Sequence, residues 1–335
     1  MTRGRLRLTF AMAPEVQERI FTPERIAAFA EVVDVAGILA DFESDAARRV
    51  LAETEILVTG WGSPAVDEVV LAAAPRLRAI LHAAGSVKHH VTSEVWEHGI
   101  EVSSAAAANA VPVAEYTAAM IVLANKRVLP IAARYRAERR ALDVEERFPG
   151  LGNFGKRVGI VGASKIGRNV IELLRPYSVE VVVYDPFLSD ADADSLGVAV
   201  VGLEELLATS DVVSVHAPSL PETRGMIDAH GIALMRPGAT LVNTARGELV
   251  DQDALTARVL RGDLFAILDV TTPWVLDADH PFFDHEHVLL TPHIAGSLGV
   301  ELGRLADVAL DETIRLSQGL PLEYPVQADE LSFTA

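Results

Sequence analysis

The chain has 335 residues, of which 50% are hydrophobic, and it carries a formal net charge of −18 at pH 7. That length allows two domains with a core each, and that composition excludes a disordered chain. The acidic balance argues against non-specific binding to nucleic acid or acidic membranes. The sequence contains no cysteine, which excludes disulfides, thiolate catalysis and cysteine metal sites.

The N-terminal segment starts basic, but its apolar run is short and is broken by Pro14. We therefore expect no signal peptide. No segment approaches the apolar length that spans a bilayer. The sequence predicts a cytoplasmic protein that has neither a membrane nor a nucleic acid as a partner.

The front third alternates short apolar runs with amphipathic stretches, a pattern typical of a parallel sheet covered by helices. Strands are predicted at residues 5–10, 55–60 and 77–85. A helix is predicted over 63–75, with Ser63 as its N-cap and Pro64 at the first helical position. A long helix or helix pair is predicted over 112–140, and Pro130 should kink or split it.

From Lys156 onward the alternation becomes very regular. Strand-like runs follow at 157–162, 179–185, 198–202, 211–218, 239–245, 264–270 and 287–293. Helical segments fall between most of them, so we predict a doubly wound sheet of the nucleotide-binding type. A last helix is predicted over 297–319, and the tail beyond it is expected to return to the first domain.

The segment VGIVGASKIG carries a variant of the glycine fingerprint of dinucleotide-binding domains. Gly162, Ser164 and Gly167 occupy the three glycine positions, after a strand and at the start of a helix. Asp185 ends the next strand, 23 residues beyond the first glycine, and its carboxylate would accept hydrogen bonds from the adenosine ribose. The carboxylate would repel a 2′-phosphate, which favours NAD over NADP. The alternative is a strand–helix turn with a capping aspartate.

Two side chains with chemistry end later strands. Arg246 follows the run 239–245 and His293 ends the run 287–293. Ligands of such sheets lie beyond the carboxyl ends of the strands. An arginine there can hold a substrate carboxylate in bidentate fashion, and a histidine can move a proton near neutral pH. Alternatively, Arg246 is a surface arginine that caps a turn.

These motifs together resemble a known family. GASKIG, YDPF, HAPSLPET, LVNTARGELVD, LDV and LLTPHIAG occur in this order, as in the NAD-dependent D-isomer-specific 2-hydroxyacid dehydrogenases. The resemblance extends from about Leu77 to Gly319. It implies two α/β domains with doubly wound parallel sheets, in which a Rossmann-type cofactor domain is inserted into a flavodoxin-like substrate domain. The substrate domain would comprise residues 1–110 and 300–335 and the NAD-binding domain residues 111–299.

The resemblance also implies a role for individual residues. Lys165 and Ile166 would lie in the pyrophosphate loop, and Thr244 and Ala245 would meet the nicotinamide side through backbone groups. Asp269 would hold the carboxamide of the cofactor. By the same resemblance, Arg246 would bind the substrate carboxylate and carbonyl, and N–H groups near Gly85 and Ser86 would bind the carboxylate. His293 would be the general acid in reduction and the base in oxidation. Arg246 and His293 would also contact the cofactor. Family members are usually homodimers, formed through the cofactor domain and the helix near Val113 to Arg140.

One family feature is missing. A glutamate usually follows the strand-end aspartate by five positions, and an alignment without gaps places Trp274 there. Without that carboxylate, His293 should titrate nearer its free value of about 6.5, or lower if it is buried. Trp274 either forms a wall of the substrate pocket or packs at a domain boundary. Four acids are candidates to replace the glutamate: Asp277, Asp279, Asp284 and Glu286.

The sequence contains a histidine cluster at His82, His89 and His90, which suggests a metal site. No partner at helical ligand spacing accompanies these residues, so we predict a solvated loop and no metal. Two functional hypotheses remain. The first is an NAD-dependent oxidoreductase that interconverts a small 2-keto acid and a D-2-hydroxy acid. The second is a dinucleotide-sensing or regulatory binding protein on the same fold, with weak catalysis.

Overall fold

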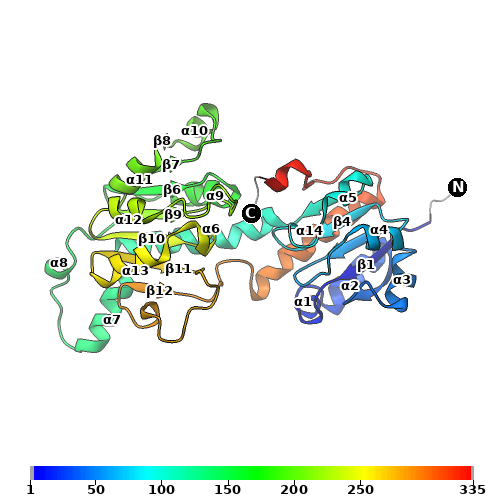
Figure 1. Ribbon diagram of the computed structural model, residues 1–335, viewed down its shortest axis with the longest axis horizontal. Coiled ribbons are helices and arrows are strands. Elements are labelled where there is room, and N and C mark those ends of the chain that lie inside the picture. The colour runs from blue at the N-terminus through cyan, green and yellow to red at the C-terminus, as the bar shows by residue number, and fades with distance from the viewer. Residues whose placement is uncertain (1–3, 333–335) are drawn as a thin grey trace. The chain divides into compact units, whose positions relative to one another are not determined.

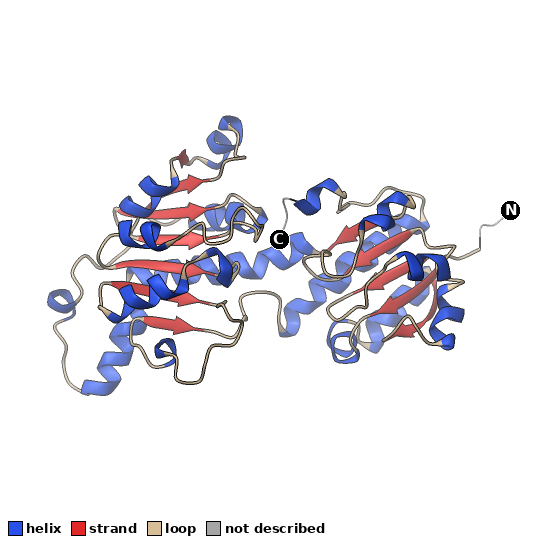
Figure 2. Cartoon of the chain, in the orientation of Figure 1, coloured by secondary structure: helices blue, strands red, loops and turns tan. Residues whose placement is uncertain are grey.

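The structure, a computed structural model, describes residues 4–332. Within these residues the chain divides into two compact units. Unit 1 contains the residues up to Ala110 and resumes at Ser297, and unit 2 contains Val111–Gly296. Each unit is a parallel sheet covered by helices (Figures 1 and 2). The predicted class is confirmed, because both sheets are parallel and the second unit is inserted into the first.

The sheet of unit 1 has five parallel strands in the order β2-β1-β3-β4-β5. Their bounds are β1 Arg7–Ala11, β2 Asp34–Leu39, β3 Ile56–Thr59, β4 Ala79–His82 and β5 Glu101–Ser104. This is the flavodoxin-like order, in which the winding reverses between β1 and β3. Thr59 and His82 are the last residues of neighbouring strands.

Unit 1 covers both faces of its sheet. Its helices are α1 Pro14–Ile20, α2 Pro23–Val32, α3 Asp45–Leu51, α4 Glu68–Ala73, α5 Ser93–Glu97 and α14 Leu302–Ser317, with short 3-10 turns at Gly299–Glu301 and Asp329–Ser332. On one face Phe10 packs between Phe21 and Phe29, with ring centroids 4.8 and 5.2 Å away. Burial of these enclosed rings contributes favourably to folding on this face of the sheet.

The C-terminal tail returns to unit 1, as expected. Val326 donates its backbone N–H to the carbonyl oxygen of Val102 on β5 at 2.7 Å. The carboxylate of Glu312 on α14 is completely buried and accepts the backbone N–H groups of Glu323 and Tyr324 at 2.8–3.1 Å. The tail thereby covers an edge strand whose backbone groups would otherwise be unpaired.

The sheet of unit 2 has seven parallel strands in the order β12-β11-β10-β9-β6-β7-β8. Their bounds are β6 Lys156–Val161, β7 Val179–Tyr184, β8 Ala199–Val200, β9 Val212–Val215, β10 Ala239–Asn243, β11 Leu264–Leu268 and β12 Val288–Leu290. The winding reverses between β6 and β9, and ligands of such sheets bind at the carboxyl ends on either side of this switch point. Each predicted strand run overlaps one of these strands, and β6 begins one residue before its predicted run.

The helices of unit 2 lie on both faces of this sheet in Figure 1. They are α7 Val128–Glu138, α8 Val144–Arg147, α9 Lys165–Leu174, α10 Asp190–Leu196, α11 Leu203–Thr209, α12 Ala229–Leu234 and α13 Gln252–Leu260, with 3-10 turns at Gly247–Leu249 and Pro281–Phe283. Helix α6 Ala106–Asn125 begins in unit 1 and continues into unit 2. The predicted split of the long helix is confirmed, but the break lies at Arg127, which has a φ of 51°, and Pro130 is in the first turn of α7.

Two sequence-based expectations about helices are wrong. The helix predicted over 63–75 begins later, because Asp67 caps α4 by accepting the N–H of Val70 at 3.1 Å. Residues 63–65 are not helical, and Val66 forms a bridge with Val91. By length and composition alone, helix α6 is apolar enough to cross a membrane. This contradicts the expectation that no segment has the apolar length of a membrane span. Its apolar character also serves the core of unit 2, where Ala114, Ala118, Ile121 and Ala124 are buried.

Candidate active site

The glycine loop between β6 and α9 lies at the switch point of unit 2. Gly162 has a φ of +98°, and a Cβ on it would lie 2.6 Å from the backbone nitrogen of Ala217, beyond the end of β9. A Cβ on Gly167 would lie 2.1 Å from the carbonyl oxygen of Gly162. Both positions therefore need glycine, the first for its backbone conformation and the second for the close packing of helix on strand.

Ser164, the departure from the fingerprint, has a structural role. It is the N-cap of α9, and its hydroxyl oxygen accepts the N–H of Gly167 at 3.3 Å. The first N–H groups of a helix have no intrahelical partner, so those of Lys165 and Ile166 remain available to an anion. The serine hydroxyl retains its own hydrogen as a further donor.

Asp185 is held at the edge of the same loop. One carboxylate oxygen accepts the N–H of Ala163 at 2.7 Å, and the other accepts the N–H of Phe187 at 2.8 Å. Each oxygen has a second lone pair. The carboxylate is thus fixed in orientation and still able to accept from a pair of ribose hydroxyls.

The segment after β10 carries Arg246, whose pKa is lowered by burial. Asn243 organises this segment, because its side chain accepts the N–H of Ala245 at 3.0 Å and donates to the carbonyl oxygen of Arg246 at 2.8 Å. The hydroxyls of Thr244 and Thr117 are 2.9 Å apart. A Cβ on Gly247 would lie 2.2 Å from the carbonyl carbon of Thr271, so glycine allows this turn to pack against the turn after β11.

Asp269 has a role that the sequence did not reveal. Its carboxylate is buried and accepts the hydroxyl of Thr291 at 2.7 Å and the N–H groups of Ile294 and Ala295 at 2.7 and 2.9 Å. Its carbonyl oxygen accepts the N–H of His293 at 3.0 Å. Asp269 therefore holds the whole turn that presents His293. A carboxylate offers about four acceptor positions, so one is left for a cofactor amide.

His293 has a φ of 55°, a strained value for a residue with a side chain. Its ring lies against the indole of Trp274, with centroids 4.7 Å apart and planes inclined by 36°. Trp274 is 66% exposed, so it covers the imidazole without being part of the core. The hydroxyl of Thr271 holds the backbone of this turn by donating to the carbonyl oxygens of Pro273 and Trp274 at 2.8 and 3.2 Å.

An indole ring, and not a carboxylate, lies beside the ring of His293. Within residues 4–332, Nδ1 of His293 is buried and has no hydrogen-bond partner. Burial lowers the pKa of His293 below its usual 6.5, the charge of Asp269 raises that pKa, and the charge of Arg246 lowers it. Arg246 and His293 thus lie near enough for their charges to interact.

The four substitute acids of the sequence analysis do not take the place of the glutamate. Glu286 pairs with Arg134 of α7, and it lines a hollow beneath α7. In the part of the chain that the structure describes, none of Asp277, Asp279 and Asp284 bonds to His293, since its buried nitrogen has no partner. The sequence allowed such a replacement because these acids are near in the chain, but the turn exposes them to solvent.

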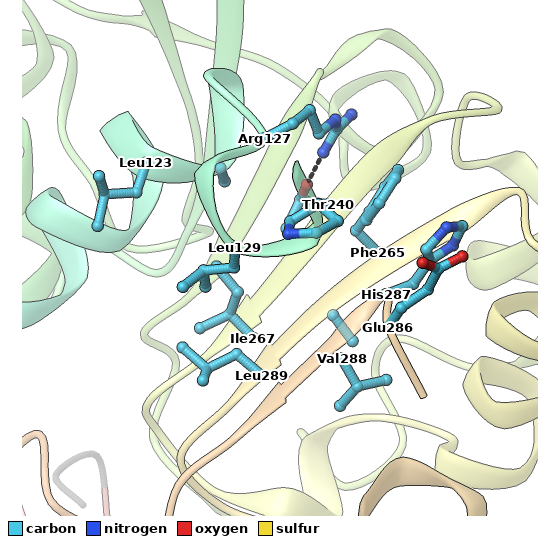
Figure 3. Close-up of a pocket in the computed structure, with 13 residues that line it drawn as sticks. Leu123, Arg127, Leu129, Thr240, Phe265, Ile267, Glu286, His287, Val288 and Leu289 are labelled. Atoms are coloured by element: carbon cyan, nitrogen blue, oxygen red, sulfur yellow. Dashed lines mark hydrogen bonds between the residues drawn. The ribbon is translucent and has the colours of Figure 1, made fainter. Parts of the chain in front are cut away.

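The hollow beneath α7 is a separate feature (Figure 3). It is at the amino ends of β10, β11 and β12, whereas Arg246, Asp269 and His293 follow the carboxyl ends of these strands. Inside it, Arg127 donates to the hydroxyl of Thr240 at 2.7 Å and lies 3.9 Å above the ring of Phe265. The hollow therefore does not belong to the strand-end site.

In unit 1, the loop after β4 contains Gly85 and Ser86, both partly buried. Among the described residues, their backbone N–H groups have no protein acceptor. Unpaired N–H groups in a partly buried loop are suited to an anionic ligand. A Cβ on Gly85 would lie 3.6 Å from the amide nitrogen of Asn109.

Sequence reasoning misjudged the histidines of this loop and missed another. His82 and His90 are 4% and 5% exposed, so the prediction of a solvated loop is wrong for both. The reason is that β4 continues to His82 and that His90 turns inward. No group of three potential ligands for a metal is present among the described residues. His216, after β9, is also buried, and its Nε2 is 2.9 Å from the hydroxyl of Ser214.

The arrangement in unit 2 fits a bound dinucleotide. Gly162 leaves open the approach to the N-terminus of α9, and Asp185 is oriented by two backbone N–H groups. Residues 118–295 match the family model described as D-isomer specific 2-hydroxyacid dehydrogenase, NAD binding domain. The expected cofactor, NAD, is thereby confirmed for this domain.

Curated relatives of this chain carry the name D-3-phosphoglycerate dehydrogenase. The D-3-phosphoglycerate dehydrogenase of Mycobacterium leprae is 36% identical over 256 residues, which cover 75% of this chain and 47% of that protein. The chain spans about half the length of the curated relatives it matches.

Solved structures share the fold over nearly the whole chain. A phosphoglycerate oxidoreductase from Rhizobium etli is 25% identical, with a TM-score of 0.82, covering 97% of this chain and 98% of that one. The D-lactate dehydrogenase from Aquifex aeolicus, complexed with NAD and lactic acid, is 26% identical, with a TM-score of 0.70, covering 93% and 96%. Since the family match includes more than half of the residues, the chain belongs to the D-isomer specific 2-hydroxyacid dehydrogenase family and carries its NAD-binding domain.

Proposed function

We propose that the protein is an NAD-dependent oxidoreductase that interconverts a small 2-keto acid and a D-2-hydroxy acid. The observation that supports this most strongly is the placement of Arg246 and His293 after the carboxyl ends of β10 and β12, the two strands that flank β11 in one sheet, with charges that interact. A guanidinium and an imidazole at that edge match the two needs of a 2-keto acid, which are an anchor for its carboxylate and a proton for its carbonyl oxygen.

The residues divide the chemistry between them. The nicotinamide cofactor, when bound, supplies the hydride that reaches the carbonyl carbon. Lys165, Ile166 and Asp185 would hold the dinucleotide, and Asp269 its carboxamide. Arg246 would bind the substrate carboxylate, with the N–H groups of the loop at Gly85. His293 would give its proton to the carbonyl oxygen during reduction and take it back during oxidation.

The turn after β11 affects the protonation of His293. A carboxylate next to an imidazole stabilises the protonated ring and sets its orientation, whereas here the ring lies against Trp274 and its buried Nδ1 has no acceptor. The aromatic face offers a weaker attraction to the imidazolium, of about 0.5–1 kcal/mol at exposed positions. The protein would therefore supply its proton at a more acidic pH than a carboxylate-assisted histidine.

The unpaired Nδ1 also favours the second hypothesis, a dinucleotide-binding sensor or regulator with weak catalysis. A substrate panel separates the two. NADH oxidation is followed with glyoxylate, hydroxypyruvate, pyruvate and phenylpyruvate from pH 5 to 8, and NADH binding is measured by calorimetry. Turnover of at least one acid, lost in Arg246→Gln, supports the enzyme. Tight NADH binding without turnover of any of them would support the sensor. The homodimer and the cytoplasmic location remain predictions.

A further inference from the structure

A buried cluster in unit 1 has no part in the chemistry proposed above. The hydroxyl oxygen of Thr59 is 2.9 Å from Nδ1 of His82 and 3.0 Å from Nε2 of His90. The two imidazole rings are 4.3 Å apart at their centroids, with planes inclined by 37°. Thr59 is completely buried and both rings nearly so. Polar groups so deeply buried are costly unless each is hydrogen-bonded.

The cluster spans the loop that carries Gly85 and Ser86. His82 ends β4 directly before the loop, His90 directly follows it, and Thr59 ends the neighbouring strand β3. Backbone bonds reinforce both ends, because Ala83 donates to the carbonyl oxygen of Thr59 at 2.8 Å and the carbonyl oxygen of His90 accepts the N–H of Val66 at 2.7 Å. One hydroxyl on a rigid strand therefore fastens the beginning and the end of a short loop.

Hydrogen-bond counting restricts the state of both rings. A threonine hydroxyl has a single hydrogen, so it can donate to only one of the two ring nitrogens, and where it does it accepts an N–H from the other ring. If Thr59 donates to Nδ1 of His82, both rings carry their hydrogen on Nε2. If it donates to Nε2 of His90, both rings carry it on Nδ1. In either arrangement the ring that accepts the hydroxyl hydrogen must be neutral, and if both rings are neutral they share one tautomer. Burial lowers the pKa of His82 well below 6.5 and that of His90 to about 4, in agreement with neutral rings.

We propose that Thr59, His82 and His90 are positioning residues that preset the loop N–H groups of Gly85 and Ser86 for the carboxylate of the substrate. This inference rests on the proposed function, since it names what holds the substrate loop in place. A loop that is ordered before binding loses less conformational entropy when the anion arrives. The network should therefore affect substrate affinity and leave the chemical step unchanged.

The first test compares three variants of the full chain. Thr59→Val removes the shared hydroxyl at nearly constant volume, Thr59→Ser keeps it, and Thr9→Val is the matched control. Thr9 is equally buried, and its hydroxyl is 2.7 Å from that of Thr54. We expect Thr59→Val to raise the KM of the 2-keto acid about tenfold, the scale of one buried hydrogen bond, with kcat within about twofold of wild type. Thr59→Ser and Thr9→Val should keep both constants. A KM unchanged in Thr59→Val, or equally raised in Thr9→Val, would overturn the proposal.

The second test does not need turnover. Nitrogen-15 spectra of the imidazoles should show two neutral rings of the same tautomer at pH 7, and amide exchange over residues 83–89 should be faster in Thr59→Val only. Rings of different tautomers, or exchange that does not change, would contradict the network. If wild type reduces no acid, the proposed function fails, and calorimetry with oxalate in the presence of NADH decides the inference. Oxalate binding weakened about tenfold in Thr59→Val supports it, whereas equal binding in both proteins, or none to wild type, overturns it.

Discussion

The indole ring of Trp274 lies against the imidazole ring of His293, with ring centroids 4.7 Å apart. An aromatic side chain thus lies beside the proposed acid, at the position where the family resemblance would place a glutamate. The ring is covered by a group that neither accepts a hydrogen bond from Nδ1 nor carries a charge. Burial lowers the pKa of His293, and the charges of Asp269 and Arg246 raise and lower it respectively.

The first prediction concerns the pH dependence and Trp274. Reduction needs protonated His293, whose pKa is lowered by burial, so kcat/KM for reduction should fall as the pH rises through a value below about 6.5. In Trp274→Glu a carboxylate next to the ring stabilises the imidazolium and raises its pKa by about 1–3 units. The pH at which kcat/KM for reduction falls should increase by that amount, and reduction at pH 7.5 should become faster.

Trp274→Phe is the matched control, because it keeps an aromatic ring and adds no charge. In steady-state measurements, the fall of its kcat/KM with rising pH should coincide with that of wild type. If the pH dependence of kcat/KM in Trp274→Glu also coincides with that of wild type, His293 is not the group that titrates in the reaction.

The second prediction concerns Arg246. Lysine keeps the charge but lacks the planar pair of donors that binds a carboxylate in bidentate fashion. We expect Arg246→Lys to lower kcat/KM by about 10²-fold and Arg246→Gln to lower it further, at the scale of a lost charged contact in the transition state. NADH affinity, measured by calorimetry, should stay within about threefold of wild type. Equal kcat/KM in wild type and Arg246→Lys would show that the guanidinium does not hold the substrate.

The third prediction concerns stability in acid. The folded-state pKa is about 4 for His90 and about 3 for His216, below the unfolded value of about 6.5. Above pH 6.5 neither state binds these protons. Below it the unfolded chain takes them up and the folded chain does not, so the free energy of unfolding falls. Each buried histidine contributes up to about 1.4 kcal/mol per pH unit, until the pH reaches its folded pKa.

Urea unfolding between pH 7.5 and 4.5 measures this slope. His90→Gln should make it shallower by about 1 kcal/mol per pH unit. His89→Gln, at an exposed neighbouring position, controls for the substitution itself. Parallel slopes for wild type and His90→Gln would mean that His90 takes up its proton equally in both states.

The fourth prediction concerns the turn that Asp269 holds. Asp269→Asn replaces an acceptor with a donor that faces the N–H of Ala295, and a buried mismatch of this kind costs about 1–3 kcal/mol. We expect a lower Tm and a lower kcat, since the turn also fixes His293. Thr291→Val removes one of the three donors to Asp269 and should have a smaller effect on both. A Tm for Asp269→Asn equal to that of wild type would show that the turn is held without the carboxylate.

Much of the architecture could be predicted from local patterns. The run Lys156–Val161, the turn at Gly162 and the helix that begins at Lys165 follow from apolar alternation, glycine and a capping serine. Strands with near-continuous apolar runs are distinctive in parallel sheets. The N-cap of α4 was misjudged because Ser63 and Asp67 are both good caps, and only the pairing of Val66 with Val91 decides between them.

The site could be predicted only in part. The sequence predicted Arg246, Asp269 and His293 at strand ends, because each lies at or just after the end of an apolar run. It did not reveal that Asp269 binds the backbone of the histidine turn, nor that Trp274 lies on the ring, since both depend on how two turns meet. The Thr59–His82–His90 network was missed for the same reason, although histidines that follow apolar strand residues are a usable signal of burial.

The measurement that tests the central claim most directly is the stoichiometry and handedness of the reaction with a 2-keto acid from the panel. Wild type should oxidise one NADH for each D-2-hydroxy acid formed, as resolved by chiral chromatography at pH 6. His293→Gln should keep its calorimetric affinity for NADH and lose about 10²–10⁴-fold in turnover, the usual contribution of general acid catalysis. An L-product, or turnover by His293→Gln equal to that of wild type, would contradict the account.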